Sequence, residues 1–312
     1  MMEPKNTPRW KPVVFHLPYD SPLDDLTVEI AMNNVGRISL SGVQPKYSLV
    51  KGEDGQLRYS KENEQGTYMM KLAPTAYFRH LQDFPANEHL TMSIASHVFS
   101  IETAECAMGF FRNGHPAYIT KRFDIDPDGS KFVQEDLASI AGFTDVKGGT
   151  DYKYSNLSYE ECGQLIAEHV NAKPVELLKF FRLVLFNFLF LNNDAHLKNF
   201  SLINRGEEYQ LAPAYDLMNT SFHLSNYNNI FALDKGLFKE GMNLSDTRWV
   251  TRDDFIEFGK RLGLPEKTVF LFINQMTAQE EKVRWFAEHS FLTEELKKLY
   301  WKDYHFRCSM LK

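Results

Sequence analysis

The most constraining feature of the sequence is an apolar run, residues 180–191, that ends abruptly in a short polar stretch. The run reads FFRLVLFNFLFL, and residues 192–199 read NNDAHLKN before the apolar character returns at Phe200. An apolar run of this length, interrupted by Arg182 and Asn187, is too short to span a bilayer and is typical of a buried helix. A polar stretch between two buried elements is either a plain loop or a site.

The composition limits the class of protein. With 43% apolar and 24% charged residues, the 312-residue chain is an ordinary soluble protein, long enough for two packed lobes or one large domain. Its net charge of −6 argues against direct nucleic-acid binding through phosphate contacts. The start, MMEPKNTPRWKP, lacks the apolar segment of a secretory signal. Three scattered cysteines indicate a reducing compartment and neither a disulfide scaffold nor a cysteine-based zinc site. We expect a cytoplasmic protein that contacts no membrane.

The pattern along the chain changes from strands to helices. Short β-rich runs precede about residue 130, and Asn113-Gly114 predicts the turn of a hairpin. Residues 86–100 have the spacing of a helix, and a second hairpin is expected around Arg205-Gly206. Further helices are expected at residues 135–140, 158–170, 174–191, 252–262, 265–289 and 293–304. Strands first and helices later predict an α+β fold of two lobes.

Three polar residues around the second hairpin could share one site. Asp194 and Asn199 lie between the apolar run and the hairpin, and Asp216 follows it in APAYDLMN. Because a hairpin brings its two ends together, Asn199 and Asp216 could converge. Carboxylate and amide oxygens are the hard ligands that Mg²⁺ prefers. With Asp194 as a proton acceptor, the set would suit phosphoryl transfer. Equally, Asn and Asp here could only cap a helix and form turns.

Two segments near the start of the chain favour the phosphoryl-transfer interpretation. SLSGVQPKYSL, residues 39–49, could fold over phosphates as a loop of free backbone N–H groups. Lys71, in YMMKLAP, could reach nucleotide phosphates, with Glu88 as the carboxylate that orients it; alternatively it is a surface lysine on an edge strand. Each feature alone is weak. Their order along the chain is the order of a kinase site.

With these segments the sequence resembles the HipA-like serine/threonine kinases, the toxins of bacterial toxin–antitoxin systems. The matching segments are SGVQPK, YMMKLAP, ANEH, TKRFD, QEDL, NNDAHLKNFSL and APAYDL. The resemblance implies an α+β, bilobal protein-kinase-like (PI3/4-kinase-like) fold. In it, residues 1–124 form a β-rich N-lobe and residues 125–312 a mainly helical C-lobe. It also implies ATP and Mg²⁺ as cofactors.

The resemblance also implies roles for individual residues. Asp194 would be the catalytic base, and Asn199 and Asp216 would hold Mg²⁺. The TKRFD segment would lie at the hinge beside adenine. The implied ATP-binding residues are Ser41, Gly42, Val43, Gln44, Lys46, Lys71, Glu88, Lys121, Arg122, Phe123, His196 and Lys198.

Some of these positions have a second interpretation. His196 could rival Asp194 as a base, but we expect it to pack and hydrogen-bond inside the loop. Lys198 could contact the transferring phosphate or be a solvated surface lysine. Ser39 and Ser41 are implied autophosphorylation sites, or they could serve only the turn. Tyr154 and other aromatic residues near it are interpreted as packing.

The chain most resembles the short HipT-type members, because only about 38 residues precede the loop. The extra N-terminal subdomain of longer relatives is expected to be absent and to be supplied by a separate small protein or antitoxin. By analogy the substrate is a protein such as an aminoacyl-tRNA synthetase. Two alternatives stay open: a small-molecule or lipid kinase of the same superfamily, and a catalytically silent scaffold that binds an antitoxin. The sequence does not decide between action in its own cell and export into a host.

Overall fold

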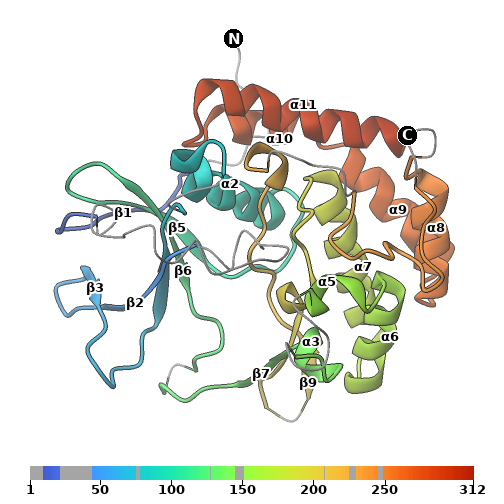
Figure 1. The fold of residues 1–312 in the computed structure, drawn as a ribbon, viewed down its shortest axis with the longest axis horizontal. Helices are drawn as coiled ribbons and strands as arrows, with labels where there is room; N and C mark the ends of the chain where they lie inside the picture. The colour runs from blue at the N-terminus through green and yellow to red at the C-terminus, as the bar shows by residue number, and fades with distance from the viewer. Residues whose placement is uncertain are drawn as a thin grey trace.

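A curled, six-stranded sheet forms one side of the molecule in the computed structural model (Figure 1). The structure describes residues 10–21, 44–74, 78–126, 128–144, 151–206, 208–224, 230–244 and 249–312. The strands run in the order β1-β5-β6-β4-β2-β3, with β1 parallel to β5 and the other neighbours antiparallel. Their bounds are β1 Val14–His16, β2 Lys46–Lys51, β3 Leu57–Tyr59, β4 Tyr68–Lys71, β5 Cys106–Phe110 and β6 Pro116–Lys121.

The sheet order places Lys71 in the interior. It ends β4, which lies between β2 and β6, and it is paired with Lys46 on one side and Tyr118 on the other. The interpretation of Lys71 as a surface lysine on an edge strand is therefore wrong. The predicted hairpin is confirmed: β5 and β6 are joined through Gly114, whose positive φ of 83° suits glycine.

One helix, α2 (Phe84–His97), lies between this sheet and the helices of the other side (Figure 1). A short 3₁₀ turn, η3 (Leu81–Asp83), precedes it. Its apolar residues, among them Leu90 and Ile94, belong to the large core of the C-terminal helices, which also takes in Met108 and Tyr118 of the sheet. A smaller, separate core fills the far side of the sheet. The helix is thus packed with both halves of the molecule.

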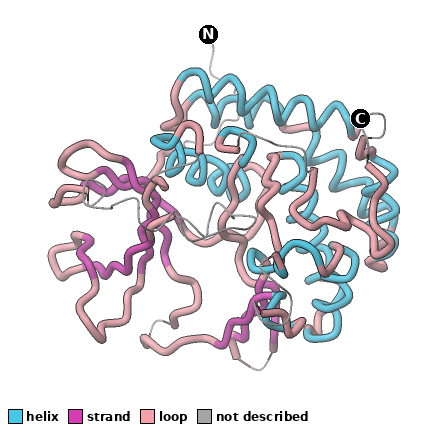
Figure 2. The backbone as a smooth tube through the Cα atoms, in the orientation of Figure 1, coloured by secondary structure: helices cyan, strands magenta, loops and turns pink. Residues whose placement is uncertain are grey.

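The remaining chain is mainly helical, with one small three-stranded sheet (Figure 2). That sheet has the order β7-β8-β9, with β7 Val133–Asp136, β8 Ser201–Asn204 and β9 Tyr209–Leu211. Two 3₁₀ turns, η4 (Leu197–Asn199) and η5 (Thr220–Phe222), flank the second hairpin. The helices are α3 Leu137–Ile140, α5 Tyr152–Ser155, α6 Tyr159–His169, α7 Lys173–Leu189, α8 Arg252–Arg261, α9 Glu266–Thr277, α10 Glu280–Glu288 and α11 Glu294–Met310.

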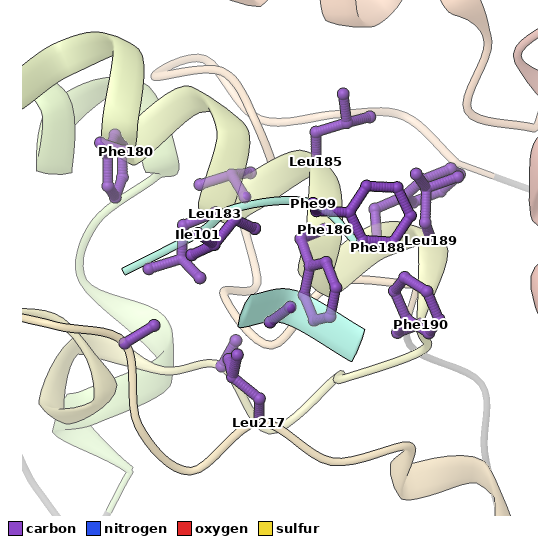
Figure 3. Close-up of a cluster of buried hydrophobic side chains, with 14 of the residues drawn as sticks. Phe99, Ile101, Phe180, Leu183, Leu185, Phe186, Phe188, Leu189, Phe190 and Leu217 are labelled. Carbon is purple, nitrogen blue, oxygen red and sulfur yellow. The ribbon is translucent and has the colours of Figure 1, made fainter. Parts of the chain in front are cut away.

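The apolar run forms the buried helix that the sequence predicts, α7, with Pro174 in its first turn. Phe186 and Phe190 stack with their ring centroids 4.4 Å apart, and Phe99 lies 5.8 Å from each of them (Figure 3). The helix is therefore a rigid base for the polar residues that follow it.

Two sequence predictions need correction. Residues 265–289 form two helices, α9 and α10, which are interrupted at Ala278 and Gln279. Residues 135 and 136 belong to strand β7, and only residues 137–140 form a helix, α3. The Asp136 side chain caps the start of this helix by accepting a hydrogen bond from the Ser139 amide. Within the described residues, no helix combines the length and apolarity that a membrane span requires.

Candidate active site

The polar stretch after α7 folds back on itself in a buried turn. Leu191 adopts a left-handed conformation with φ of 50°, which reverses the chain as the helix ends. Asn192 then donates hydrogen bonds to Oδ1 of Asn187, at 2.9 Å, and to the backbone oxygen of Asp216, at 3.3 Å. The buried amide of Asn192 thus joins α7 to the segment that follows the second hairpin.

The Asp216 side chain contacts residues from both halves of the molecule. Its Oδ1 accepts a hydrogen bond from the Lys71 ammonium, and its Oδ2 lies 3.4 Å from Nδ2 of Asn199. Asp216 also has a positive φ of 56°, a strained conformation for a residue with a side chain and one that gathers at functional sites. The structure brings Asn199 and Asp216 together across the hairpin and adds Lys71 from the large sheet.

Lys71 is buried between two carboxylates. Its Nζ lies 2.6 Å from Oε1 of Glu88 on α2 and also contacts Asp216. Burial by itself lowers the pKa of Lys71, but the two carboxylates outweigh it and hold that pKa above its ordinary value. Burial raises the pKa of Glu88 to about 7, against the opposing attraction of Lys71. A fixed cation therefore faces the cleft from the sheet.

Asp194 is held by a residue that the sequence did not single out. Its Oδ1 accepts a hydrogen bond of 2.8 Å from the hydroxyl of Tyr154 on α5. Interpreting Tyr154 as a packing residue was incomplete, since the ring is buried but its hydroxyl points at a carboxylate. Forty positions separate the two residues, and no local pattern in the sequence signals such a contact.

His196 stabilises the loop by packing. Its ring meets that of Tyr154 edge-on, with centroids 5.1 Å apart, and its backbone N–H donates to Oδ1 of Asn199 at 3.0 Å. Burial lowers the pKa of His196 to about 3, with a smaller contribution from Lys153, so the imidazole is neutral. Within the described residues, neither ring nitrogen has a hydrogen-bond partner. His196 therefore packs inside the loop as expected, and its hydrogen bond there is made by the backbone N–H.

A cleft with a volume of about 440 Å³ runs from Lys71 to the segment that joins the two halves. Phe123 lies in this segment, with its ring 5.8 Å from that of Tyr215. Arg122 makes a two-pronged ion pair with Asp124 at the same place. Of the predicted ATP-binding residues, the cleft is lined by Lys46, Lys71, Glu88, Lys121, Arg122, Phe123 and Lys198. A cleft of this size and mixed lining suits a nucleotide.

A second, smaller pocket adjoins this cleft. It is lined by Gln44, Asp194 and Asn199, together with Lys71, Glu88 and Asp216. The described residues do not include four of the predicted site residues, Ser39, Ser41, Gly42 and Val43. The structure therefore places the end of the predicted phosphate loop, but not its centre.

The residue types at Asp216 and Asn199 suit a magnesium ion. In this structure, however, the Asn199 amide turns its Nδ2 toward the Asp216 carboxylate, and its Oδ1 accepts a hydrogen bond from the His196 N–H. One carboxylate and one amide oxygen are hard ligands, and Mg²⁺ is commonly held by one or two protein groups plus phosphates and water. Among the described residues there is no group of three or more His, Cys, Asp or Glu that could hold a metal by itself. The phosphates of a bound nucleotide would supply further ligands to a metal held at Asp216.

Comparison with known proteins identifies the family of this chain. The model of a family described as HipA-like C-terminal domain matches residues 38–283. The "Putative kinase" of Haemophilus influenzae is 28% identical over 88% of this chain and 82% of its own length. "Putative kinase Y4dM" of Sinorhizobium fredii is 28% identical over 86% of this chain and 64% of its own length.

Two solved structures share the fold. The first is the Shewanella oneidensis MR-1 toxin–antitoxin complex of HipA, HipB and operator DNA. It matches with a TM-score of 0.70 at 22% identity, over 92% of this chain and 68% of that chain. The second is the Helicobacter pylori proinflammatory kinase CtkA, with a TM-score of 0.54 at 17% identity, over 81% of this chain and 90% of that chain. Both likenesses support the predicted bilobal, kinase-like α+β architecture.

Proposed function

The chain belongs to the family of HipA-like C-terminal domains, and on that premise we propose that it is an ATP-dependent serine/threonine protein kinase. The observation that carries the proposal is the contact of Lys71 with Glu88 and Asp216, beside Asp194 in one pocket. A lysine of the sheet, a glutamate of the next helix and two aspartates of the helical half are the groups that phosphoryl transfer needs. The proposed lobes are residues 1–124 and 125–312, joined at Phe123.

In the proposed reaction, Asp194 accepts the proton of a substrate hydroxyl. The hydroxyl oxygen forms a bond to the γ-phosphorus of ATP, and the bond between that phosphorus and the β,γ-bridging oxygen breaks to release ADP. Asp216 and Asn199 would hold Mg²⁺, which neutralises phosphate charge when it is bound. Most of the acceleration comes from positioning and charge stabilisation, because no covalent intermediate is formed on the protein.

Lys71 has two states in this proposal. Without nucleotide it contacts both carboxylates, as described. With ATP bound, it contacts the phosphates, and Glu88 keeps it aligned. Lys46 and Lys198 would add positive charge along the same cleft, and Phe123 with Tyr215 would provide an apolar face for adenine. Gln44 and the rest of the loop that begins at Ser41 would cover the phosphates.

We further propose that phosphorylation of Ser39 or Ser41 switches the kinase off. A phosphate adds about −1.5 to −2 charges at neutral pH. Lys46, in the last part of this segment, and Lys71 both line the cleft that would receive ATP. A phosphorylated loop would therefore compete with ATP for the same positive groups.

The substrate and partners are also proposals. The resemblance supports a protein substrate such as an aminoacyl-tRNA synthetase. The HipA structure that this chain resembles is a complex with HipB and operator DNA, which supports a separate antitoxin or subdomain-like partner in the bacterial cytoplasm. We propose no direct nucleic-acid contact by this chain, in keeping with its net charge of −6.

The test is transfer of labelled γ-phosphate from ATP to the protein itself and to a bacterial lysate. We expect wild-type protein to label itself and a small number of lysate proteins, and Asp194→Ala to lose at least about 100-fold of this activity. Equal labelling by the two proteins would exclude Asp194 as the base. Absence of both labelling and Mg·ATP binding in wild-type protein would instead favour a silent scaffold.

A further inference from the structure

The residue that precedes Glu88 on α2 is bonded to the segment that carries Asp216. The side chain of Asn87 donates from Nδ2 to the backbone oxygen of Asn219 at 2.7 Å, and its Oδ1 accepts from the Asn219 amide at 3.1 Å. Both residues are buried. Because Asn219 follows Asp216 by three positions, this reciprocal pair fixes how far Glu88 can move from Asp216.

A neutral histidine sets the orientation of the Asn87 amide. Nδ1 of His223 lies 3.0 Å from the backbone oxygen of Arg79, which can only accept, so Nδ1 carries the proton. Nε2 is then an acceptor, and it lies 2.9 Å from Nδ2 of Asn87. Burial lowers the pKa of His223 to about 4, which keeps the ring in this neutral form. The amide therefore has one arrangement that satisfies both of its neighbours.

The C-terminal helix α11 also forms hydrogen bonds with the segment that follows Asp216. Oδ2 of Asp303 accepts a hydrogen bond from Nδ2 of Asn219 at 3.2 Å. It also lies 3.0 Å from the Ser221 hydroxyl. Asp303 is half-buried, and burial raises its pKa. A carboxylate is rarely buried unless its oxygens are hydrogen-bonded, and here both bonds go to the segment after Asp216.

Residues of α11 and its N-cap also form hydrogen bonds with α2 and with the residue before it. The Tyr300 hydroxyl donates to Oγ1 of Thr91 at 2.9 Å, and the Thr91 hydroxyl donates to the backbone oxygen of Asn87 at 2.9 Å. At the start of α11, the amide of Thr293 donates to Oδ1 of Asp83, one residue before α2 begins, at 2.8 Å. Figure 1 shows α11 running along the molecule beside α2. The helix therefore bridges the two elements that supply the carboxylate partners of Lys71.

We propose that Asn87 and Asp303 are positioning residues that clamp Glu88 and Asp216 at the separation that phosphoryl transfer needs. The inference rests on the function proposed for the Lys71 site. Neither residue lines the cleft, so each acts through the carboxylate that it positions. A displacement of about 1 Å at a reacting centre can cost about 100-fold in rate, so a loosened clamp would lower kcat in a protein that is still folded.

The experiment uses the full chain and compares Asp303→Ala, Asp303→Asn and a matched control, Glu295→Gln. Glu295 is an exposed carboxylate on the same helix. Hydrogen–deuterium exchange is measured for residues 84–97 and 216–222, and kcat and the half-saturating Mg²⁺ concentration are measured below each variant's melting temperature. We expect Asp303→Ala to speed exchange in both segments, to lower kcat by about tenfold or more and to raise the Mg²⁺ requirement. Asparagine can still accept both hydrogen bonds, so Asp303→Asn should stay within about threefold of wild type.

Variants of Asn87 show whether loss of the clamp lowers kcat apart from any effect on the stability of the fold. Asn87→Asp keeps the acceptor of Asn87 but removes its donor, and it places a carboxylate against the oxygen of Asn219 and Nε2 of His223. Its loss of kcat should match that of Asn87→Ala. If Asp303→Ala does not fold, Ser221→Ala removes one donor to Asp303 and should show a smaller effect of the same kind.

The outcomes distinguish this inference from the proposed function. Folded Asp303→Ala with wild-type exchange, kcat and Mg²⁺ dependence, or with only a lower melting temperature, would overturn the clamp. If wild-type protein transfers no phosphate, the proposed function fails. The clamp is then tested by exchange alone, and an effect of Asp303→Ala no larger than that of Glu295→Gln would overturn it as well.

Discussion

The hydroxyl of Tyr154 donates a hydrogen bond of 2.8 Å to Oδ1 of Asp194, from a helix that lies 40 positions earlier in the chain. This bond ties the Asp194 carboxylate to α5 and limits how it can rotate. Tyr154 therefore sets the direction of the proposed base.

Replacing Tyr154 by phenylalanine should remove this bond while keeping the buried ring. A hydrogen bond to a charged group contributes about 1.5–3 kcal/mol, so kcat should fall by about tenfold or more, with little change in the KM for ATP. Steady-state kinetics measure both constants. Tyr152→Phe, on the same short helix, is the control, and equal kcat for the two variants would show that Asp194 does not depend on Tyr154.

Removal of the Lys71 charge should destabilise the protein more than removal of the Glu88 charge. Lys71→Met leaves two carboxylates without their shared cation, and breaking a buried pair costs about 3–5 kcal/mol. Glu88→Gln keeps Lys71 paired with Asp216. We expect a lower melting temperature for Lys71→Met than for Glu88→Gln, and weaker ATP binding for both.

Calorimetric melting and titration with Mg·ATP measure the two effects for these variants. Lys260→Met is a suitable control, because this lysine of α8 is exposed and its ion pair with Glu257 lies on the surface. Wild-type ATP affinity in Lys71→Met would contradict the role proposed for Lys71.

Stability should fall as the pH drops below about 6.5. Burial lowers the pKa of His89 and His223 to about 4 and that of His196 to about 3. Between these values and 6.5 the unfolded chain binds protons that the folded protein does not, so acid favours unfolding. Each histidine contributes up to about 3 kcal/mol of this loss by pH 4.

Melting temperatures measured from pH 8 to pH 4 test this expectation. His223→Gln should melt lower at pH 7, because it disturbs the bonds to Arg79 and Asn87, but its stability should depend less on pH than that of wild type. An exposed histidine, His305, is paired with Glu280 on the surface, and His305→Gln is the control. Parallel pH curves for wild type and His223→Gln would mean that folding does not lower the pKa of His223.

A permanent negative charge in the loop that begins at Ser39 should weaken nucleotide binding. Ser39→Asp or Ser41→Asp imitates part of the charge of a phosphate, which would compete with ATP for Lys46 and Lys71. We expect a several-fold higher Kd for Mg·ATP, larger at low salt because the interaction is electrostatic. Ser39→Asn and Ser41→Asn, which add similar volume without charge, are the controls. Unchanged affinity in both aspartate variants would remove the basis of the proposed switch.

Much of the fold was predictable because local rules fix it. The alternation around Asn113-Gly114 predicted the β5–β6 hairpin, and the apolar run with Pro174 predicted α7. Residues 265–289 were predicted as one helix, because no glycine or proline marks the break between α9 and α10. The segment at Glu135 was predicted as helix, because its strand character depends on pairing with β8, far along the chain.

By itself, the sequence determined the order of the polar groups and the hairpin that brings Asn199 to Asp216, since both follow from short-range geometry. Only the tertiary structure decided that Lys71 lies on an interior strand, that Tyr154 reaches Asp194, and that α11 joins Asn87 to the segment after Asp216. Those contacts depend on how the packed cores orient whole elements. Periodicity and spacing record which face of a helix or strand is buried, but not which distant side chain it meets there.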